Sequence, residues 1–212
     1  MTNDVMSFVG SECYDLILYL AKTLNALNVQ VLIIDNAEDR SLATCIPDLE
    51  DAPLGEPVDY DNGITVVRGL QVIPDNFNYV LIYHGQDPYV DLSGSNEVFL
   101  VTDYQKHNVE FLEAIELAED NYPFLIVRDR VSSKITTKSI QAQLEKFEID
   151  PKDVLTIDDT DADLQCKVLC QYNTVVNFQS TSPSMKEFMY TALSEGFDRK
   201  TIKDAIKRAA RR

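Results

Sequence analysis

Glycine is scarce in this sequence, and so are the flexible tracts that glycine makes. Only seven of the 212 residues are glycine, and neither these nor the eight prolines gather into a stretch that would serve as a linker. The longest apolar run also falls well short of the ~20 residues that a membrane-spanning helix needs. A chain of this length fits one domain with a core of its own, so we expect a single folded unit.

Basic residues are missing from the first ten positions, so the sequence gives no sign of a secretory leader. The four cysteines, Cys13, Cys45, Cys166 and Cys170, are scattered in the way typical of reduced thiols in a cytosolic protein. Cys166 and Cys170 would share a helix face, but no further Cys or His lies near them, and we expect no metal site. We therefore predict a cytoplasmic protein, and the alternative is a protein attached peripherally to a membrane.

Positive charge is in short supply, and its distribution is uneven. The net charge is −16, which disfavours nucleic acid as a partner because phosphate contacts need a basic surface. Residues 198–212 nevertheless hold seven of the 19 basic residues and two of the 35 acidic ones, so they carry +5 and residues 1–197 carry −21. We therefore predict an acidic domain over residues 1–197, followed by a basic tail over residues 198–212.

Apolar residues alternate between two kinds of pattern along the acidic domain. Short β-branched and apolar runs predict strands, and apolar residues three or four apart predict helices between them. The expected strands are 5–9, 29–35, 64–68, 79–83, 98–102, 124–127 and 154–157, and the expected helices are 16–27, 108–119, 137–147, 161–172 and 184–196. This order predicts an α/β fold, a doubly wound and mostly parallel sheet of about seven strands with helices on both faces.

Four stretches carry a resemblance to a known family. They are Leu20-Ala-Lys-Thr-Leu24 followed by Val29-Gln-Val-Leu-Ile-Ile-Asp35, then Asn62-Gly-Ile-Thr-Val-Val67, Phe77-Asn-Tyr-Val-Leu-Ile82 and Ser95-Asn-Glu-Val-Phe-Leu-Val-Thr102. In this order they resemble the ParA/MinD-type deviant Walker A ATPases, a SIMIBI-class P-loop family, over residues 5–195. The resemblance implies a P-loop NTPase-like fold and a nucleotide loop after the first strand.

The loop at that place departs from the family pattern. It has one glycine and no lysine, and reads Gly10, Ser11, Glu12, Cys13, Tyr14, Asp15. The family's loop cradles phosphate with backbone N–H groups, lysines and a Mg²⁺-binding hydroxyl. We expect Glu12 and Asp15 to cap the following helix and to take the space of the phosphates, which leaves a vestigial nucleotide loop.

The residues that the resemblance places beside this loop are altered too. Tyr83 stands where the family has its switch II aspartate, so Mg²⁺ would lack its usual carboxylate. We interpret Asp35 as a strand-end or turn residue and His84 as an exposed loop histidine. No catalytic residue and no cofactor are therefore expected, with ATP and Mg²⁺ as the alternative.

The basic tail predicts an amphipathic helix. Its apolar and basic positions are candidates for contact with a protein partner or with an anionic membrane surface: Arg199, Lys200, Ile202, Lys203, Ile206, Lys207, Arg208 and Arg211. A helix packed against its own domain is the other reading. MinD-like proteins are similar in ending with a membrane-targeting helix.

Three functions from different classes remain open. The first is a non-catalytic ParA/MinD-like pseudo-ATPase that positions or assembles partner proteins, and a homodimer is one of its candidate states. The analogy for this function is the TadZ/CpaE-like group, which localises pilus or secretion machinery. The second is a nucleotide-binding switch or weak ATPase that uses an atypical loop with Ser11, Asp35, His84 and Asp87 around the ligand. The third, a response-regulator-like receiver, fits poorly because Ile82 leads to Tyr83 and not to an aspartate.

Overall fold

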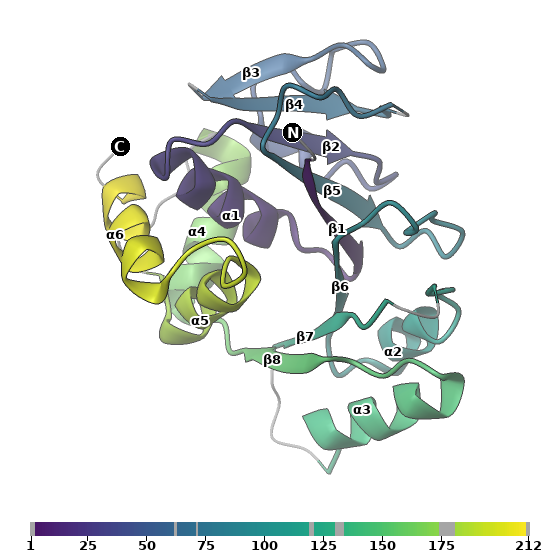
Figure 1. The fold of residues 1–212 in the computed structure, drawn as a ribbon. Coiled ribbons are helices and arrows are strands. Elements are labelled where there is room, and N and C mark those ends of the chain that lie inside the picture. The colour runs from purple at the N-terminus through teal and green to yellow at the C-terminus, as the bar shows by residue number, and fades with distance from the viewer. Residues whose placement is uncertain are drawn as a thin grey trace.

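One eight-stranded sheet runs through the protein, with helices on both of its faces (Figure 1). The structure is a computed structural model, and it describes residues 3–61, 63–70, 72–118, 121–129, 134–173 and 181–210. The strands are β1 (Asp4–Gly10), β2 (Val31–Asp35), β3 (Val58–Asp61), β4 (Ile64–Arg68), β5 (Tyr79–Gly85), β6 (Glu97–Thr102), β7 (Phe124–Arg128) and β8 (Asp153–Ile157). Their order across the sheet is β3-β4-β2-β5-β1-β6-β7-β8, and every pair is parallel except β3 with β4.

The helices divide between the two faces of the sheet. They are α1 (Tyr14–Ala26), α2 (Lys106–Leu112), α3 (Thr137–Leu144), α4 (Asp161–Asn173), α5 (Pro183–Ala192) and α6 (Arg199–Ala209), with short 3₁₀ turns η1 (Ala43–Cys45) and η2 (Glu145–Phe147). Helices α1, α4, α5 and α6 share one core with the sheet, and α2 and α3 share another on the opposite face. Over β2, β4 and β5, that second face is packed by Leu70, Ile73 and Phe77 of the β4–β5 connection.

Aromatic stacking joins the central strands to the helices. The ring of Phe99 in β6 lies 4.7 Å from that of Phe8 in β1 and 4.9 Å from that of Phe124 in β7, both stacked. Phe188 of α5 meets Phe99 edge-on at 6.0 Å. Such contacts add to the free energy gained by burying the rings, so the middle of the sheet is a rigid base for the loops at its ends.

The predicted fold class is confirmed, with differences at particular elements. The prediction missed β3, an antiparallel edge strand whose two aspartates and half-exposed side chains hide the apolar pattern of a strand. The expected helix 108–119 is α2, which ends at Leu112; Ile115 beyond it is buried, and this explains the extended helical pattern. Helix α5 begins with Pro183 at its first position, after a Ser182 cap that accepts from the Met185 N–H.

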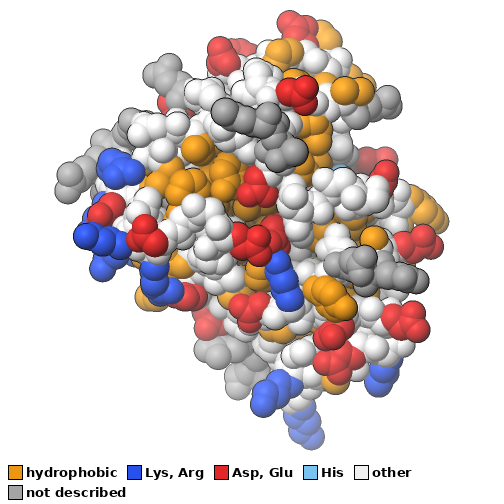
Figure 2. Space-filling view, viewed as in Figure 1, with side chains coloured by type: hydrophobic (Ala, Val, Ile, Leu, Met, Phe, Trp, Pro, Cys, Tyr) orange, Lys and Arg blue, Asp and Glu red, His pale blue; other side chains and the backbone are white. Residues whose placement is uncertain are grey.

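The basic tail forms α6, and its apolar face is inside the protein. Asp198 caps the helix by accepting from the N–H groups of Lys200 and Thr201. Ile202 and Ile206, which we expected to contact a partner or a membrane, are buried against α1 and α5. Lys and Arg side chains gather over α6, at the left of Figure 2. The boundary at residue 197 stays a prediction, but α6 is part of the core.

Gly10 is paired with Val101 of β6 at the end of β1. Its φ is +118°, and a Cβ there would lie 2.0 Å from the Val101 carbonyl oxygen. No side chain fits that space, so strand packing by itself requires this glycine.

We expect Gly10→Ala to lower the free energy of unfolding by about 2–4 kcal/mol, through backbone strain and the clash with Val101. Gly94→Ala is the matched control, because a Cβ at Gly94 meets nothing within 4 Å. Urea denaturation followed by circular dichroism measures both, and equal midpoints would contradict the packing argument.

Truncation of Ile202 tests whether α6 belongs to the core. Ile202→Ala should cost about 2–5 kcal/mol because it opens a cavity beneath α6. The neighbouring Lys203→Ala, on the exposed side, should stay within about 0.5 kcal/mol of the parent. If the two variants unfold at the same urea concentration as the parent, α6 is not docked in solution.

Candidate functional site

A cleft of ≈ 700 Å³ opens at the carboxyl ends of the central strands. Gly10 at the end of β1, His84 in β5 and Arg128 at the end of β7 all line it. From β1 the chain moves first toward β2 and later returns to β6 on the other side, so the cleft lies where the strand order reverses. Ligands of doubly wound α/β proteins bind at this kind of position.

Carboxylates dominate the lining of the cleft. Six acidic residues border it: Glu12, Glu38, Asp39, Asp87, Asp103 and Asp129. The basic residues along the same wall are Arg128 and Lys167, and each is already engaged in an ion pair. Such a lining favours cations and basic groups, and it opposes the entry of phosphate.

The loop between β1 and α1 has a backbone donor that is already occupied. The Ser11 N–H donates to the Val101 carbonyl at 2.8 Å, and the Ser11 hydroxyl is buried without a hydrogen-bond partner among the described residues. Cys13 holds the cap position of α1 and makes no side-chain capping bond. The expectation that Glu12 and Asp15 cap this helix is therefore wrong, because both side chains turn to basic residues from elsewhere in the chain.

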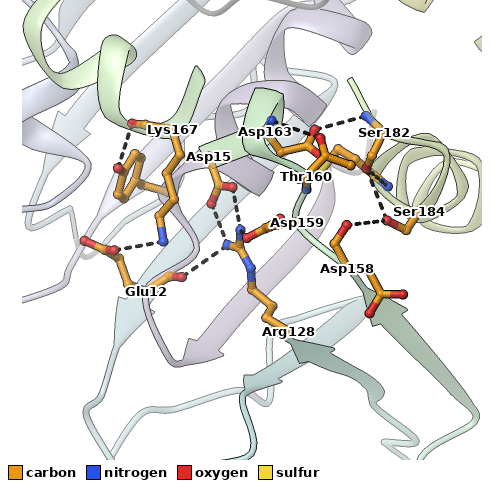
Figure 3. Close-up of polar contacts among 12 residues, drawn as sticks. Glu12, Asp15, Arg128, Asp158, Asp159, Thr160, Asp163, Lys167, Ser182 and Ser184 are labelled. Carbon is orange, nitrogen blue, oxygen red and sulfur yellow. Dashed lines mark hydrogen bonds and ion pairs between the residues drawn. The ribbon is translucent and has the colours of Figure 1, made fainter. Parts of the chain in front are cut away.

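Arg128 joins the loop to the ends of two other strands (Figure 3). Its Nη1 and Nη2 donate to the two carboxylate oxygens of Asp15 at 2.7 and 2.8 Å, and Nη2 also donates to Asp159 at 2.8 Å. A longer bond of 3.3 Å runs from Nη1 to the Glu12 carbonyl oxygen. The side chain of Arg128 is 3% exposed, so this is a buried network of one cation and two carboxylates.

The two carboxylates of the network respond differently to this environment. Burial favours the neutral form of Asp15, but the Arg128 guanidinium outweighs burial and lowers the pKa of Asp15. Burial raises the pKa of Asp159, and the nearby Asp15 charge adds to that rise while Arg128 opposes it. Acidification should therefore protonate Asp159 before Asp15.

Helix α4 brings a second cation to the loop. Lys167 of α4 pairs with Glu12 at 3.0 Å, and its carbonyl oxygen accepts from the Tyr14 hydroxyl at 2.8 Å. The helix is fixed at its start by Asp163, which accepts from the Thr160 hydroxyl at 2.7 Å and from the Ser182 N–H at 3.0 Å (Figure 3). The rim of the cleft is thus held from both α1 and α4.

His84 lies in a β-bulge and not in an exposed loop as we expected. Phe8 of β1 is opposite Tyr83, but Val9 is opposite Gly85, so His84 is the extra residue of β5. Its side chain turns inward, with Nε2 3.2 Å from the Ser7 hydroxyl, and burial lowers its pKa to about 4. His84 is therefore a neutral, buried imidazole on the wall of the cleft.

Asp35 and Tyr83 are both buried, and neither borders the cleft. One Asp35 oxygen accepts from the Ala37 N–H at 3.2 Å, the strand-end role that we predicted, and burial raises the pKa of Asp35 to about 6. The Tyr83 hydroxyl donates to Asp39 at 2.8 Å. Tyr83, which stands where the family has its Mg²⁺-binding aspartate, is thus part of the core.

The sequence interpretation did not single out the cations of the site. Arg128 directly follows the apolar run of β7, and Asp159 comes two residues after the end of β8. Parallel strands deliver side chains to one edge of the sheet, so charges at strand ends were the signal to follow. Of the basic tail, Arg199 pairs with Glu187 and Arg208 donates to the Ala26 carbonyl oxygen. Lys200, Lys203 and Lys207 are exposed, and Arg211 lies outside the described residues.

Among the residues that the structure describes, no three or more His, Cys, Asp or Glu side chains form a group suited to a metal ion. Within the same residues, no helix has the length and apolarity to cross a bilayer.

Comparison with known proteins identifies the fold. No family model and no curated protein matches the sequence, but solved structures do. An AMPPNP-bound plasmid partition protein of Borrelia burgdorferi has a TM-score of 0.58 at 14% identity, with 98% of this chain and 99% of that chain covered. A chain of the Aquifex aeolicus MinC:MinD complex has 0.62 at 14% (92% and 98% covered), and pNOB8 ParA bound to nonspecific DNA has 0.52 at 13% (99% and 98% covered).

These neighbours superpose on nearly the whole chain, at identities that inform on the fold alone. The protein thus has the α/β, P-loop NTPase-like fold of the ParA/MinD ATPases.

Proposed function

We propose that this protein is a non-catalytic, ParA/MinD-like pseudo-ATPase that acts as a positioning or assembly factor through contacts with other proteins. The observation that carries the proposal is the Arg128 network. The Arg128 guanidinium lies against the loop at residues 10–15, and its charge is already paired with Asp15 and Asp159.

The electrostatics of the cleft support this proposal. A nucleoside triphosphate would bring several negative charges next to six carboxylates, and Lys167 could reach it only by leaving Glu12. One pair of like charges 4 Å apart costs about 4 kcal/mol at an effective dielectric constant of 20. With neither a free lysine nor a vacant Ser11 N–H in the loop, little offsets that repulsion.

The residues at the place where hydrolysis would occur support the same proposal. Phosphoryl transfer depends on positive charge and on a metal carboxylate held beside the γ-phosphate. Tyr83 is turned into the core toward Asp39, and His84 is neutral at physiological pH because its pKa is about 4. Tyr83 therefore offers no carboxylate to a metal ion, and His84 offers no positive charge to a phosphate.

The expected partners are proteins, and a second copy of this chain is one candidate. One fold neighbour comes from a MinC:MinD complex, and another is bound to DNA. For this chain, a net charge of −16 disfavours nucleic acid. The exposed Lys200, Lys203 and Lys207 of α6 are candidate contacts for a protein or an anionic membrane, and pilus or secretion machinery is the cellular setting that we propose.

A nucleotide-binding switch is the second candidate, and the size and position of the cleft favour it. The cavity of ≈ 700 Å³ lies at the reversal of strand order, and one fold neighbour holds AMPPNP. In that case Lys167 would exchange Glu12 for the ligand.

Titration calorimetry separates these two candidates. ATP and ADP, each with and without Mg²⁺, should give no binding heat and no thermal shift at protein concentrations that detect a millimolar site. An active ATPase of the same fold, measured in the same buffer, is the positive control. Mg²⁺-dependent binding would refute the pseudo-ATPase proposal and establish the switch.

The Arg128 network should matter for stability, since removing its cation leaves two carboxylates buried without a partner. We expect Arg128→Met to lower the free energy of unfolding at pH 7 by about 3–5 kcal/mol. Arg199→Met is the matched control: its ion pair with Glu187 is exposed, and its loss should cost about 1 kcal/mol or less.

The cost of Arg128→Met should also depend on pH in a defined direction. In the parent, the lowered pKa of Asp15 contributes stability that is present above the unfolded pKa and is lost on acidification. Without the Arg128 charge, burial should raise the pKa of both carboxylates in the variant. Protonation should then relieve them, and the gap in the free energy of unfolding between variant and parent should narrow from pH 7 to pH 5. Guanidinium denaturation at both pH values measures the gap; a constant gap would mean that the charges do not carry the effect.

A further inference from the structure

Two thiols from distant parts of the chain meet beside the cleft. Cys45 ends η1 and Cys170 lies in α4, 125 residues later, and their sulfur atoms are 3.8 Å apart. Both side chains are buried, and η1 packs directly against α4. All four cysteines of the chain are free thiols.

The hydrogen bonds of the two thiols leave their sulfur atoms facing each other. Cys45 donates to the Ser41 carbonyl at 3.4 Å, and Cys170 donates to the Lys167 carbonyl at 3.1 Å. Each thiol therefore has a carbonyl acceptor within its own segment as well as the facing sulfur, and either sulfur can be the donor between the two. A disulfide has a sulfur–sulfur distance of about 2 Å, so the two sulfur atoms have to approach each other by about 1.8 Å before they bond.

The two cysteines are not equivalent. Cys170 lines a small space between α1 and α4, together with Asp15, Tyr19, Cys166 and Lys167, and this space is too small to hold a water molecule. A hydrogen bond from the Cys45 thiol lowers the pKa of Cys170 even though burial opposes this, and the same contact raises the pKa of Cys45. The contact with Cys45 therefore favours the thiolate at Cys170, so Cys170 is the first to react once a peroxide reaches the pair.

We propose that Cys45 and Cys170 form a redox modification site, at which a peroxide converts the two thiols into a disulfide. The Cys170 thiolate attacks one oxygen of hydrogen peroxide, which gives a sulfenic acid and hydroxide. The Cys45 sulfur then attacks the Cys170 sulfur and displaces the sulfenic oxygen as water. Overall two thiols and one hydrogen peroxide give one disulfide and two waters, so the thiols are oxidised and the peroxide is reduced.

The bond would join two borders of the cleft. The segment that ends in Cys45 carries Asp39, and α4 carries Lys167. A link between them fixes the distance between these walls, whichever ligand or partner the cleft accepts. This inference does not rest on the proposed function.

Mass spectrometry of the whole protein tests the site. Reduced protein should show four thiols in denaturant, and hydrogen peroxide at one equivalent should leave two, with the mass of the chain lower by two hydrogens. Peptide mapping should find Cys45 linked to Cys170. Four remaining thiols, a gain of oxygen in place of the hydrogen loss, or a link through Cys13 or Cys166 would overturn the proposal.

Variants assign the roles. Cys45→Ala should stop at a sulfenic acid on Cys170 that a dimedone probe traps, whereas Cys166→Ala, one turn away on the same helix, should still form the bond. Peroxide should raise the melting temperature of the parent by about 10 °C, because the bond closes a loop of more than 100 residues, and should leave that of Cys45→Ala unchanged. If Cys45→Ala does not fold, Cys45→Ser replaces it; an equal peroxide shift in parent and variant would refute the assignment.

Discussion

A single buried guanidinium determines where three distant parts of this chain meet. Arg128 closes β7, Asp15 opens α1 and Asp159 follows β8, and all three lose contact with water when they pair. Two carboxylates share one cation, so the network carries a net negative charge in a place of low polarity. Such a group is tolerated only with short, well-directed bonds, and the bidentate pairing at 2.7 and 2.8 Å supplies them.

The remainder of the cleft is built around that network. With Asp15 committed to Arg128, the loop at residues 10–15 follows β6 through the Ser11 N–H, and Glu12 is left to hold Lys167. Helix α4 is then held at its start by Asp163 and in its middle by Lys167. At the place of the P-loop in this fold, ion pairs within the protein therefore occupy the loop, and acidic side chains surround them.

The sequence predicted the parallel sheet because β1, β2, β5, β6 and β7 are apolar runs buried on both faces. It did not predict β3, whose aspartates belong to an exposed edge, or the bulge that buries His84, because register is set by pairing between strands. The degenerate loop was visible in the sequence, but the direction of Glu12 and Asp15 was not. Local rules favour a helix cap there, and only the fold brings Arg128 and Lys167 within reach.

The docking of α6 on α1 also bears on how the protein is made. The Arg208 side chain binds the carbonyl oxygen of Ala26, 182 residues earlier, and Ile202 covers the same helix. During translation, at roughly 5–20 residues per second, α1 therefore waits on the order of ten seconds or more for its cover. The part of α1 that α6 covers stays exposed during that time, while its contacts with β2, β5 and α5 can form earlier, so this side of the core is completed last.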